Sequence, residues 1–169
     1  LGRGYIQAFA GGYYLLADRQ MDQDYLFMLA NRIYEPSYIS RESALAYYLV
    51  IPETVLGVTS VSSRKTNQFD SQWGIFSYRS IKPAMMFGYH VVEREKMVKY
   101  KIASLEKTVL DYLYWNTSIS SVEDFVGLRW NRQELLGLAE HPSFEKALKV
   151  FNNKALERRA HLLLEYILA

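Results

Sequence analysis

The chain has 169 residues, half of them hydrophobic and 22% charged, and its net charge is +2. This length and composition predict a globular protein with one sizeable domain, or one domain plus a fragment of another, and exclude an intrinsically disordered chain. Because the sequence has no cysteine, no signal segment and no apolar run of roughly 18 residues, disulfides, thiol catalysis and cysteine-ligated zinc are excluded and we expect a soluble, cytoplasmic protein.

The first residues predict a β-hairpin. Apolar and polar residues alternate through Tyr5, Gln7 and Phe9, and the alternation resumes from Tyr13 after a Gly-Gly pair. A two-stranded hairpin is only marginally stable alone. We therefore expect that a preceding segment, against which the hairpin packs, is missing from this sequence.

Two helices and then several strands follow. The first helix is predicted over "DQDYLFMLANRI" (22–33), and the second from an N-cap at Ser40 until Pro52 stops it. Period-2 alternation and β-branched residues predict strands in "TVLGVTSVSS", "GIFSYRSI", "GYHVVE" and "VKYKIA". The polar stretch "RKTNQFDSQW" (64–73) is predicted to be a link that closes the first two strands into a hairpin.

The chain is predicted to be helical from Ser104 to its end. Helical patterns cover "SLEKTVLDYLYW", "RQELLGLAE", a segment that begins at Pro142, and "KALERRAHLLLEYILA". The predicted class is therefore α+β, with a small mixed or antiparallel sheet, flanking helices and a C-terminal helical tail.

Residues typical of catalysis are not grouped in recognisable patterns. The three histidines are far apart in sequence, no glycine-rich loop could cradle a phosphate, and no Glu-x-Lys triplet of a metal-dependent nuclease occurs. Asp22 and Asp24 are spaced like the metal ligands of a nucleotidyltransferase, but a helix N-cap explains them better. We predict no catalytic residues, no metal site, no cofactor and no enzymatic activity.

One cluster of charged residues could still form a site. Lys107 and Asp111 are four residues apart in a predicted helix, which favours a solvent-exposed ion pair. The alternative is a degenerate nuclease-like domain that uses Glu106 and Asp111 to cleave nucleic acid.

Three stretches together resemble a known family. They are "NRIYEPSYISRESALAYYLVIPE", "TSVSSRKTNQFDSQWGIFSYRSIKPAMMFGY" and "KIASLEKTVLDYLYW". This pattern is similar to the AbiEi-type antitoxins of bacterial type IV toxin-antitoxin systems, which act in phage abortive infection, and it runs from about Tyr14 to at least Trp115. The helical tail is less diagnostic.

The resemblance implies a function and a domain organisation. Residues 1–17 would be the wing of an N-terminal winged helix-turn-helix whose recognition helix lies upstream, and residues 18–169 the antitoxin domain. The protein would repress its own operon by binding operator DNA and would counter a nucleotidyltransferase-like toxin, directly or indirectly. Arg3, Tyr5 and Gln7 of the wing would contact DNA phosphates, which position a protein without choosing the sequence.

The basic residues concentrate in the middle of the chain. Residues 60–101 carry eight basic and three acidic groups, whereas the rest of the chain has an acidic excess. If residues 64–73 close a hairpin, Arg64 and Lys65 lie near its turn and Arg79 and Lys82 toward its far end. These four are candidate contacts to operator phosphates, or else a solvated edge that protects a strand from pairing with another chain.

Two further alternatives remain at this point. The aromatic residues of "GIFSYRSI" could stack on nucleic-acid bases, but packing of Phe76 and Tyr78 in the core is the favoured interpretation. The domain could also serve only in assembly, with "GYHVVE" or the final helix as its interface.

Overall fold

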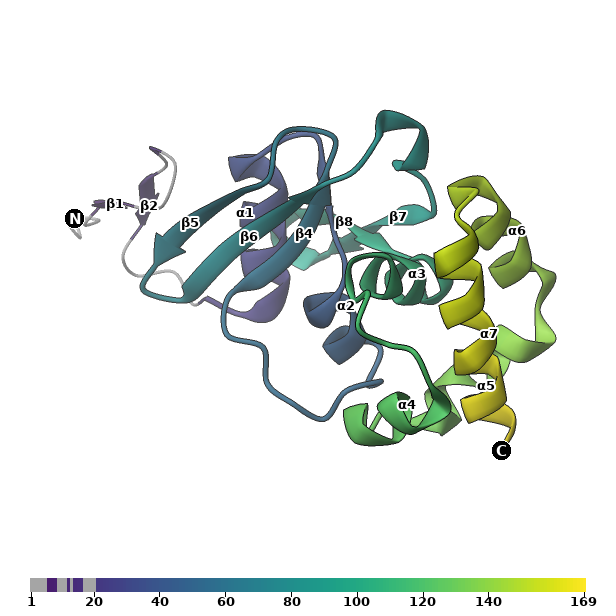
Figure 1. Cartoon of the computed structure of the whole chain (residues 1–169). Helices are drawn as coiled ribbons and strands as arrows, with labels where there is room; N and C mark the ends of the chain where they lie inside the picture. The colour runs from purple at the N-terminus through teal and green to yellow at the C-terminus, as the bar shows by residue number, and fades with distance from the viewer. Residues whose placement is uncertain (1–5, 9–11, 13, 17–20) are drawn as a thin grey trace.

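The computed structural model describes residues 6–8, 12, 14–16 and 21–169 (Figure 1). Within them, strands and helices combine into the predicted α+β class. The strands are β1 (Ile6–Ala8), β2 (Tyr14–Leu16), β3 (Ser37–Ile39), β4 (Val58–Ser62), β5 (Asn67–Ser71), β6 (Gly74–Ser80), β7 (Tyr89–Arg94) and β8 (Val98–Ala103). The α-helices are α1 (Gln23–Ile33), α2 (Glu42–Tyr47), α3 (Leu105–Trp115), α4 (Val122–Leu128), α5 (Arg132–Glu140), α6 (Pro142–Phe151) and α7 (Lys154–Leu168). Two 3-10 turns are η2 (Pro83–Met85) and η3 (Glu95–Met97).

The predicted N-terminal hairpin is confirmed. Strands β1 and β2 pair in antiparallel fashion, with Gln7 opposite Leu15. None of the helices in the part of the chain that the structure describes has both the length and the apolar character needed to cross a bilayer.

The main sheet has six strands in the order β5-β6-β4-β3-β8-β7. Strands β3 and β8 are parallel, as are β4 and β6, and the other neighbours are antiparallel. The prediction that residues 64–73 form only a link is wrong, because they contain the edge strand β5. Its polar residues Asn67, Gln68 and Asp70 are all exposed, so the sequence carried little strand signal there.

This extra strand changes the connection between β4 and β6. The chain passes from β4 to the sheet edge, forms β5, and returns as β6 beside β4, so the predicted hairpin of β4 and β6 is wrong. Two glycines allow β4 and β6 to begin side by side: Gly57 and Gly74 have φ angles of 84° and 107°. A Cβ atom on Gly57 would lie 2.1 Å from the carbonyl oxygen of Ile75, so no larger residue fits there without a shift.

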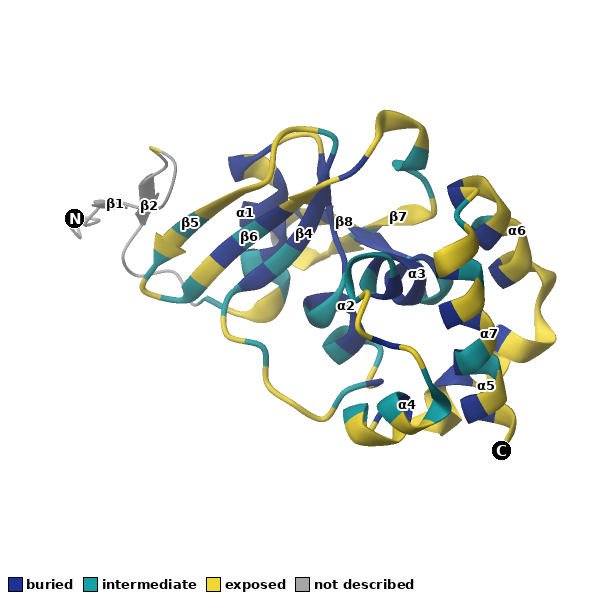
Figure 2. Cartoon of the chain, viewed as in Figure 1, coloured by how far each residue is buried: buried dark blue, intermediate teal, exposed yellow. Residues whose placement is uncertain are grey.

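Helix α1 covers one face of the sheet (Figure 1). It begins at Asp22, whose Oδ1 accepts the N–H of Tyr25 at 2.9 Å, which confirms the N-cap interpretation. Phe76 and Tyr78 are buried beneath it, and the Tyr78 hydroxyl donates to the carbonyl of Ala30 at 2.6 Å. Figure 2 shows buried positions alternating with less buried ones along β6. The aromatic residues of β6 therefore belong to the core, as predicted.

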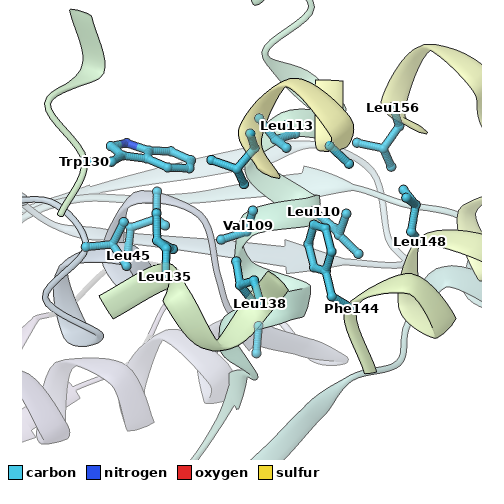
Figure 3. Packing of buried hydrophobic residues seen from close by; sticks show 14 of the residues in the cluster. Leu45, Val109, Leu110, Leu113, Trp130, Leu135, Leu138, Phe144, Leu148 and Leu156 are labelled. Carbon is cyan, nitrogen blue, oxygen red and sulfur yellow. The ribbon is translucent and has the colours of Figure 1, made fainter. Parts of the chain in front are cut away.

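The opposite face carries α2, α3 and the C-terminal helices. Helix α3 begins at Ser104, whose hydroxyl accepts the N–H of Lys107. Figure 3 shows apolar side chains of the core that α2, α3 and the tail share: Leu45, Val109, Leu110, Leu113, Trp130, Leu135, Leu138, Phe144, Leu148 and Leu156. The predicted helical tail is confirmed as a group of four helices, α4 to α7, packed through one continuous core with α3.

The second predicted helix is shorter than expected. Its N-cap is Arg41 rather than Ser40, and it ends at Tyr47 instead of continuing to Pro52. Ser40 does not cap because its hydroxyl donates to Asp111 on α3. The helix stops early because Leu49 has a φ angle of 59°, which no residue within an α-helix adopts.

Candidate nucleic-acid interface

The parallel pairing of β4 and β6 brings basic residues to one end of the sheet. Val61 lies opposite Arg79, and the last residue of β4 lies opposite the last residue of β6. Arg64 and Lys65 follow the end of β4, and Lys82 follows the end of β6. All four are exposed. The hairpin expectation separated them into two pairs at opposite ends, whereas the structure gathers them at one end, which we call the basic end.

Arg64 is held against the end of α1. Its guanidinium lies 3.9 Å from the ring centroid of Tyr34, and its Nη1 donates to the carbonyl of Glu35 at 3.2 Å. The Tyr34 hydroxyl in turn donates to the carbonyl of Lys65 at 2.8 Å. The loop that carries Arg64 and Lys65 is therefore fixed to the rest of the domain by both its backbone and its side chain.

A second arginine lies near Arg79. Arg41 and Arg79 both line a hollow of about 530 Å³, together with Thr66, Asn67, Gln68, Ser77 and Tyr78. Burial lowers the pKa of Arg41, the adjacent Glu42 carboxylate raises it, and the like charge of Arg79 lowers it further. Sequence reasoning missed Arg41, and no signal near it in the sequence indicated that it would meet a strand about forty residues away.

The charges of these two arginines are balanced differently. Nη2 of Arg41 lies 3.1 Å from Oε1 of Glu42. Arg79 forms no ion pair with any carboxylate among the described residues. Arg79 is therefore the cation of this hollow that is best placed to bind an external anion.

The other three predicted DNA contacts cannot be compared with the basic end. Arg3 and Tyr5 lie outside the described residues, and Gln7 is placed only through its strand, β1.

The Lys107–Asp111 pair differs most from expectation. The ion pair is present, but both side chains have 0% exposure, so the prediction of a solvent-exposed pair is wrong. Lys107 Nζ donates to Oδ1 of Asp111, and the hydroxyls of Tyr38 and Ser40 donate to Oδ2 at 2.9 and 2.8 Å. The aromatic rings around Nζ are those of Phe151, Phe87 and Tyr38, with centroids 4.6, 4.9 and 5.5 Å away. The helical tail, which supplies Phe151, and the segment before β7, which supplies Phe87, seal this pair from water.

Burial has the largest influence on the pKa values of both Lys107 and Asp111. It raises the pKa of Asp111 and lowers the pKa of Lys107, while their mutual attraction and hydrogen bond oppose both changes. Burial and the nearby Asp111 charge also raise the pKa of the Tyr38 phenol. Each polar atom of the carboxylate has a partner, which is what a buried charge requires to be tolerated.

Glu106 and Asp111 do not form a common site. The Asp111 carboxylate points into the core, whereas Glu106 is half-buried and its Oε1 accepts the hydroxyl of Ser143 on α6 at 2.8 Å. No group of three acidic or histidine side chains that could hold a metal ion occurs among the residues that the structure describes.

A scan against protein-family models finds no match to this chain, and a search of curated proteins finds none either.

Proposed function

We propose that this chain belongs to a bacterial antitoxin of the AbiEi type, which represses its own operon by binding operator DNA and counters a nucleotidyltransferase-like toxin. The resemblance carried by residues 31–53, 59–89 and 101–115 supports the family. The observation that carries the DNA-binding part is the parallel pairing of β4 and β6, which gathers Arg64, Lys65, Arg79 and Lys82 at one end of the sheet.

The basic end suits an auxiliary role in DNA binding. Arginine and lysine side chains neutralise phosphates, which adds affinity and makes it depend on salt. Such contacts fix the position of a protein on the duplex without reading its bases. In this proposal the N-terminal winged helix-turn-helix selects the operator, and the basic end strengthens the complex.

The nuclease-like alternative has weaker support. It relied on Glu106 and Asp111 as metal ligands, but the Asp111 carboxylate is fully buried and already accepts three hydrogen bonds. A scissile phosphate could not approach it without unfolding of the helical tail. We therefore propose a chain without catalytic activity or cofactor.

The DNA-binding part is tested with the full-length gene product and duplex DNA from upstream of its gene. Each true phosphate contact that is removed should reduce the slope of log affinity against log salt by ~0.9. The test variant is Arg79→Ala with Lys82→Ala, and the matched control is Lys146→Ala with Lys149→Ala, two exposed lysines of α6 in the helical tail.

The expected result is weaker binding and a smaller slope for the β6 variant, with no change of base preference and no change for the α6 control. If affinity and slope are unchanged in the β6 variant, the basic end does not contact DNA and is only a solvated sheet edge.

The antitoxin part is tested separately by growth. The proposal expects a nucleotidyltransferase-like gene next to this one, and that gene is expressed alone and together with this chain. Rescue of growth by the chain is expected, and growth arrest that persists despite normal levels of the chain would contradict the antitoxin role.

A further inference from the structure

Strand β7 forms an open edge of the main sheet. It is the last strand in the sheet order (Figure 1) and pairs with β8 along its full length, from Tyr89 to Arg94. All of its residues except Val92 are exposed. Val91, at the middle of the strand, is 54% exposed although it is apolar. The strand therefore presents both its backbone edge and an apolar side chain to solvent.

The backbone groups of alternate β7 residues point away from β8. The carbonyl of Gly88 accepts the N–H of Ser104, the residue after β8, at 2.7 Å. Because the two groups of a trans peptide point in opposite directions, the N–H of Tyr89 faces outward. The alternation of an antiparallel pair repeats this orientation at Val91 and Glu93.

The far side of β8 confirms this orientation. Lys101 lies opposite Val91, and its N–H donates to Oδ1 of Asn31 on α1, which lies away from β7. The two residues therefore form a pair that exchanges no hydrogen bonds, so the N–H and C=O of Val91 also point away from β8. The outward backbone groups of β7 have no hydrogen-bond partner among the described residues.

Strand β7 also lacks the features that usually protect a sheet edge. Natural edge strands carry lysine or proline, or are interrupted by a bulge. The sequence "YHVVER" has neither residue, and its pairing with β8 is continuous. Its charged residues lie at one end and are paired within the domain, Glu93 with Lys99 and Arg94 with Asp24. The other edge strand, β5, exposes polar side chains instead.

We propose that β7 pairs with β7 of a second copy of this chain, in antiparallel fashion about a two-fold axis at Val91. In this register Val91 lies opposite Val91 of the second copy, and Tyr89 lies opposite Glu93 of the second copy. These are the outward-facing positions, so each opposed pair exchanges both of its N–H···O bonds. The six-stranded sheet continues into the second copy, and the exposed Val91 side chains meet at the axis.

The side chains favour this register over its neighbours. An axis at Val92 would place His90 opposite Arg94 and Val91 opposite the Glu93 carboxylate. Like charges that face each other across two strands are destabilising, so this register is disfavoured when His90 is protonated. An axis at His90 would leave the outward groups of Glu93 beyond the end of the partner strand. With the axis at Val91, no charged side chain lies opposite one of the same sign.

This interface is independent of the function proposed above. Three strands separate β7 from β6 in the sheet order, so pairing at β7 leaves the basic end uncovered. A single strand edge is a small interface, so we expect a weak dimer that forms at high protein concentration. No DNA and no toxin are needed to test it, and its failure would not affect the antitoxin proposal.

Sedimentation equilibrium of the chain between micromolar and millimolar concentrations is the first experiment. The average mass should rise with concentration from that of one chain toward that of two. Amide hydrogen exchange of the same samples should slow at high concentration for the N–H groups of Tyr89, Val91 and Glu93. The N–H groups of His90 and Val92 already pair with β8, so their exchange should change little.

Val91→Lys and Val150→Lys form a matched pair of variants. Val150, on α6, is 50% exposed, close to the exposure of Val91. Val91→Lys places two ammonium groups opposite each other at the axis and should weaken the dimer by at least about tenfold. Val150→Lys should leave the dimer unchanged. Both substitutions are at exposed positions, so both variants should fold.

Single cysteines test the register, because the chain has no cysteine of its own. Opposed residues of a hydrogen-bonded pair have Cα atoms about 5.5 Å apart, a distance that a disulfide can span. Mild oxidation with oxidised glutathione should therefore cross-link Val91→Cys into a covalent dimer. Glu93→Cys should not cross-link to itself, because Glu93 lies opposite Tyr89. Val150→Cys gives the rate of cross-linking by chance collision.

Two results would overturn the proposal. One is the mass of a single chain at millimolar concentration, with unchanged exchange of the three outward N–H groups. The other is a dimer that Val91→Lys does not weaken and that cross-links no faster through Val91→Cys than through Val150→Cys, because its interface would then lie elsewhere.

Discussion

Charged side chains in this domain occupy two opposite environments. At the basic end, Arg79 and Lys82 are exposed, and Arg79 has no carboxylate partner among the described residues. Between the sheet and the helical tail, Lys107 and Asp111 are fully buried, and each oxygen of the carboxylate accepts a hydrogen bond. Figure 2 shows this contrast between the exposed strand ends and the buried helix α3.

The comparison shows that burial, rather than residue type, decides what a charge contributes. An exposed cation keeps its hydration, costs the fold little, and is available to an external anion. A buried ion pair has lost its hydration, so each partner depends on the other. The basic end should therefore affect binding and hardly affect stability, and the buried pair should do the reverse.

The largest effect is expected from breaking the buried pair. Asp111→Ala leaves the Lys107 ammonium and the hydroxyls of Tyr38 and Ser40 without their acceptor. The free energy of unfolding should fall by about 3–5 kcal/mol, as is usual when one partner of a buried pair is removed. Urea unfolding followed by circular dichroism measures it.

The double variant Lys107→Met with Asp111→Leu is the control for that loss. Replacing both charges by apolar groups of similar volume removes the unpaired charge, so this variant should recover most of the lost stability. If Asp111→Ala unfolds no more easily than the original chain, water must reach this carboxylate, and the contrast between the two regions fails.

A smaller effect is expected at the glycine packed on Lys107. Gly88 has a φ angle of 69°, and a Cβ atom there would lie 3.0 Å from the Lys107 Cβ. Gly88→Ala should therefore cost about 1–3 kcal/mol through backbone strain and crowding. Gly137→Ala is its control, because Gly137 lies within α5 with nothing within 4 Å of the added methyl group.

The control Gly137→Ala should change the free energy of unfolding in the opposite direction. Alanine in place of a helical glycine is expected to stabilise the domain by roughly 0.5–1 kcal/mol. Equal effects of the two substitutions would show that the packing around Lys107 is looser than its burial indicates. Thermal unfolding of both variants side by side provides the measurement.

The basic end should show only small changes in stability. Arg79→Ala should alter the free energy of unfolding by less than about 0.5 kcal/mol, because it removes an exposed side chain. Arg64→Ala should cost ~0.5–1 kcal/mol, because Arg64 stacks on Tyr34. A loss above that range for Arg79→Ala would mean that this residue supports the fold, contrary to the comparison.

The smallest effect concerns Glu106, the half-buried neighbour of the buried pair. Although burial acts to raise its pKa, hydrogen bonds from its own N–H, Ser143 and Ser104 leave it lowered. Because the pKa of Glu106 is lower in the folded state than in the unfolded chain, its ionised carboxylate stabilises the fold at pH values above the unfolded pKa. This stabilisation is lost as the pH falls through the folded pKa. Ser143→Ala should therefore raise the pKa of Glu106 and reduce that acid-dependent loss.

Nuclear magnetic resonance titration of the Glu106 carboxyl carbon measures this shift. Ser120→Ala serves as the control, since its hydroxyl contacts Asp124 rather than Glu106. A pKa of Glu106 that stays the same in Ser143→Ala would show that α6 does not hold this carboxylate.

The sequence by itself determined the elements whose signals are local. The cap at Asp22 was readable because a capping side chain lies within three residues of its donor. The strands β4, β6, β7 and β8 and the helices α3, α5, α6 and α7 followed from their sequence patterns. The burial of Phe76 and Tyr78 was predicted because aromatic residues on one face of a strand favour a core.

Only the tertiary structure decided what depends on partners distant in sequence. Strand β5 was missed because a polar edge strand takes its hydrogen bonds from a neighbour and buries little of its own. Without it, the parallel pairing of β4 and β6, and hence the basic end, could not be predicted. The burial of Lys107 and Asp111 depends on Tyr38, Phe87 and Phe151, which lie 20 to 73 residues from their partners in this network. A spacing of four residues places two charges on one helix face, but the rest of the chain determines whether that face meets water.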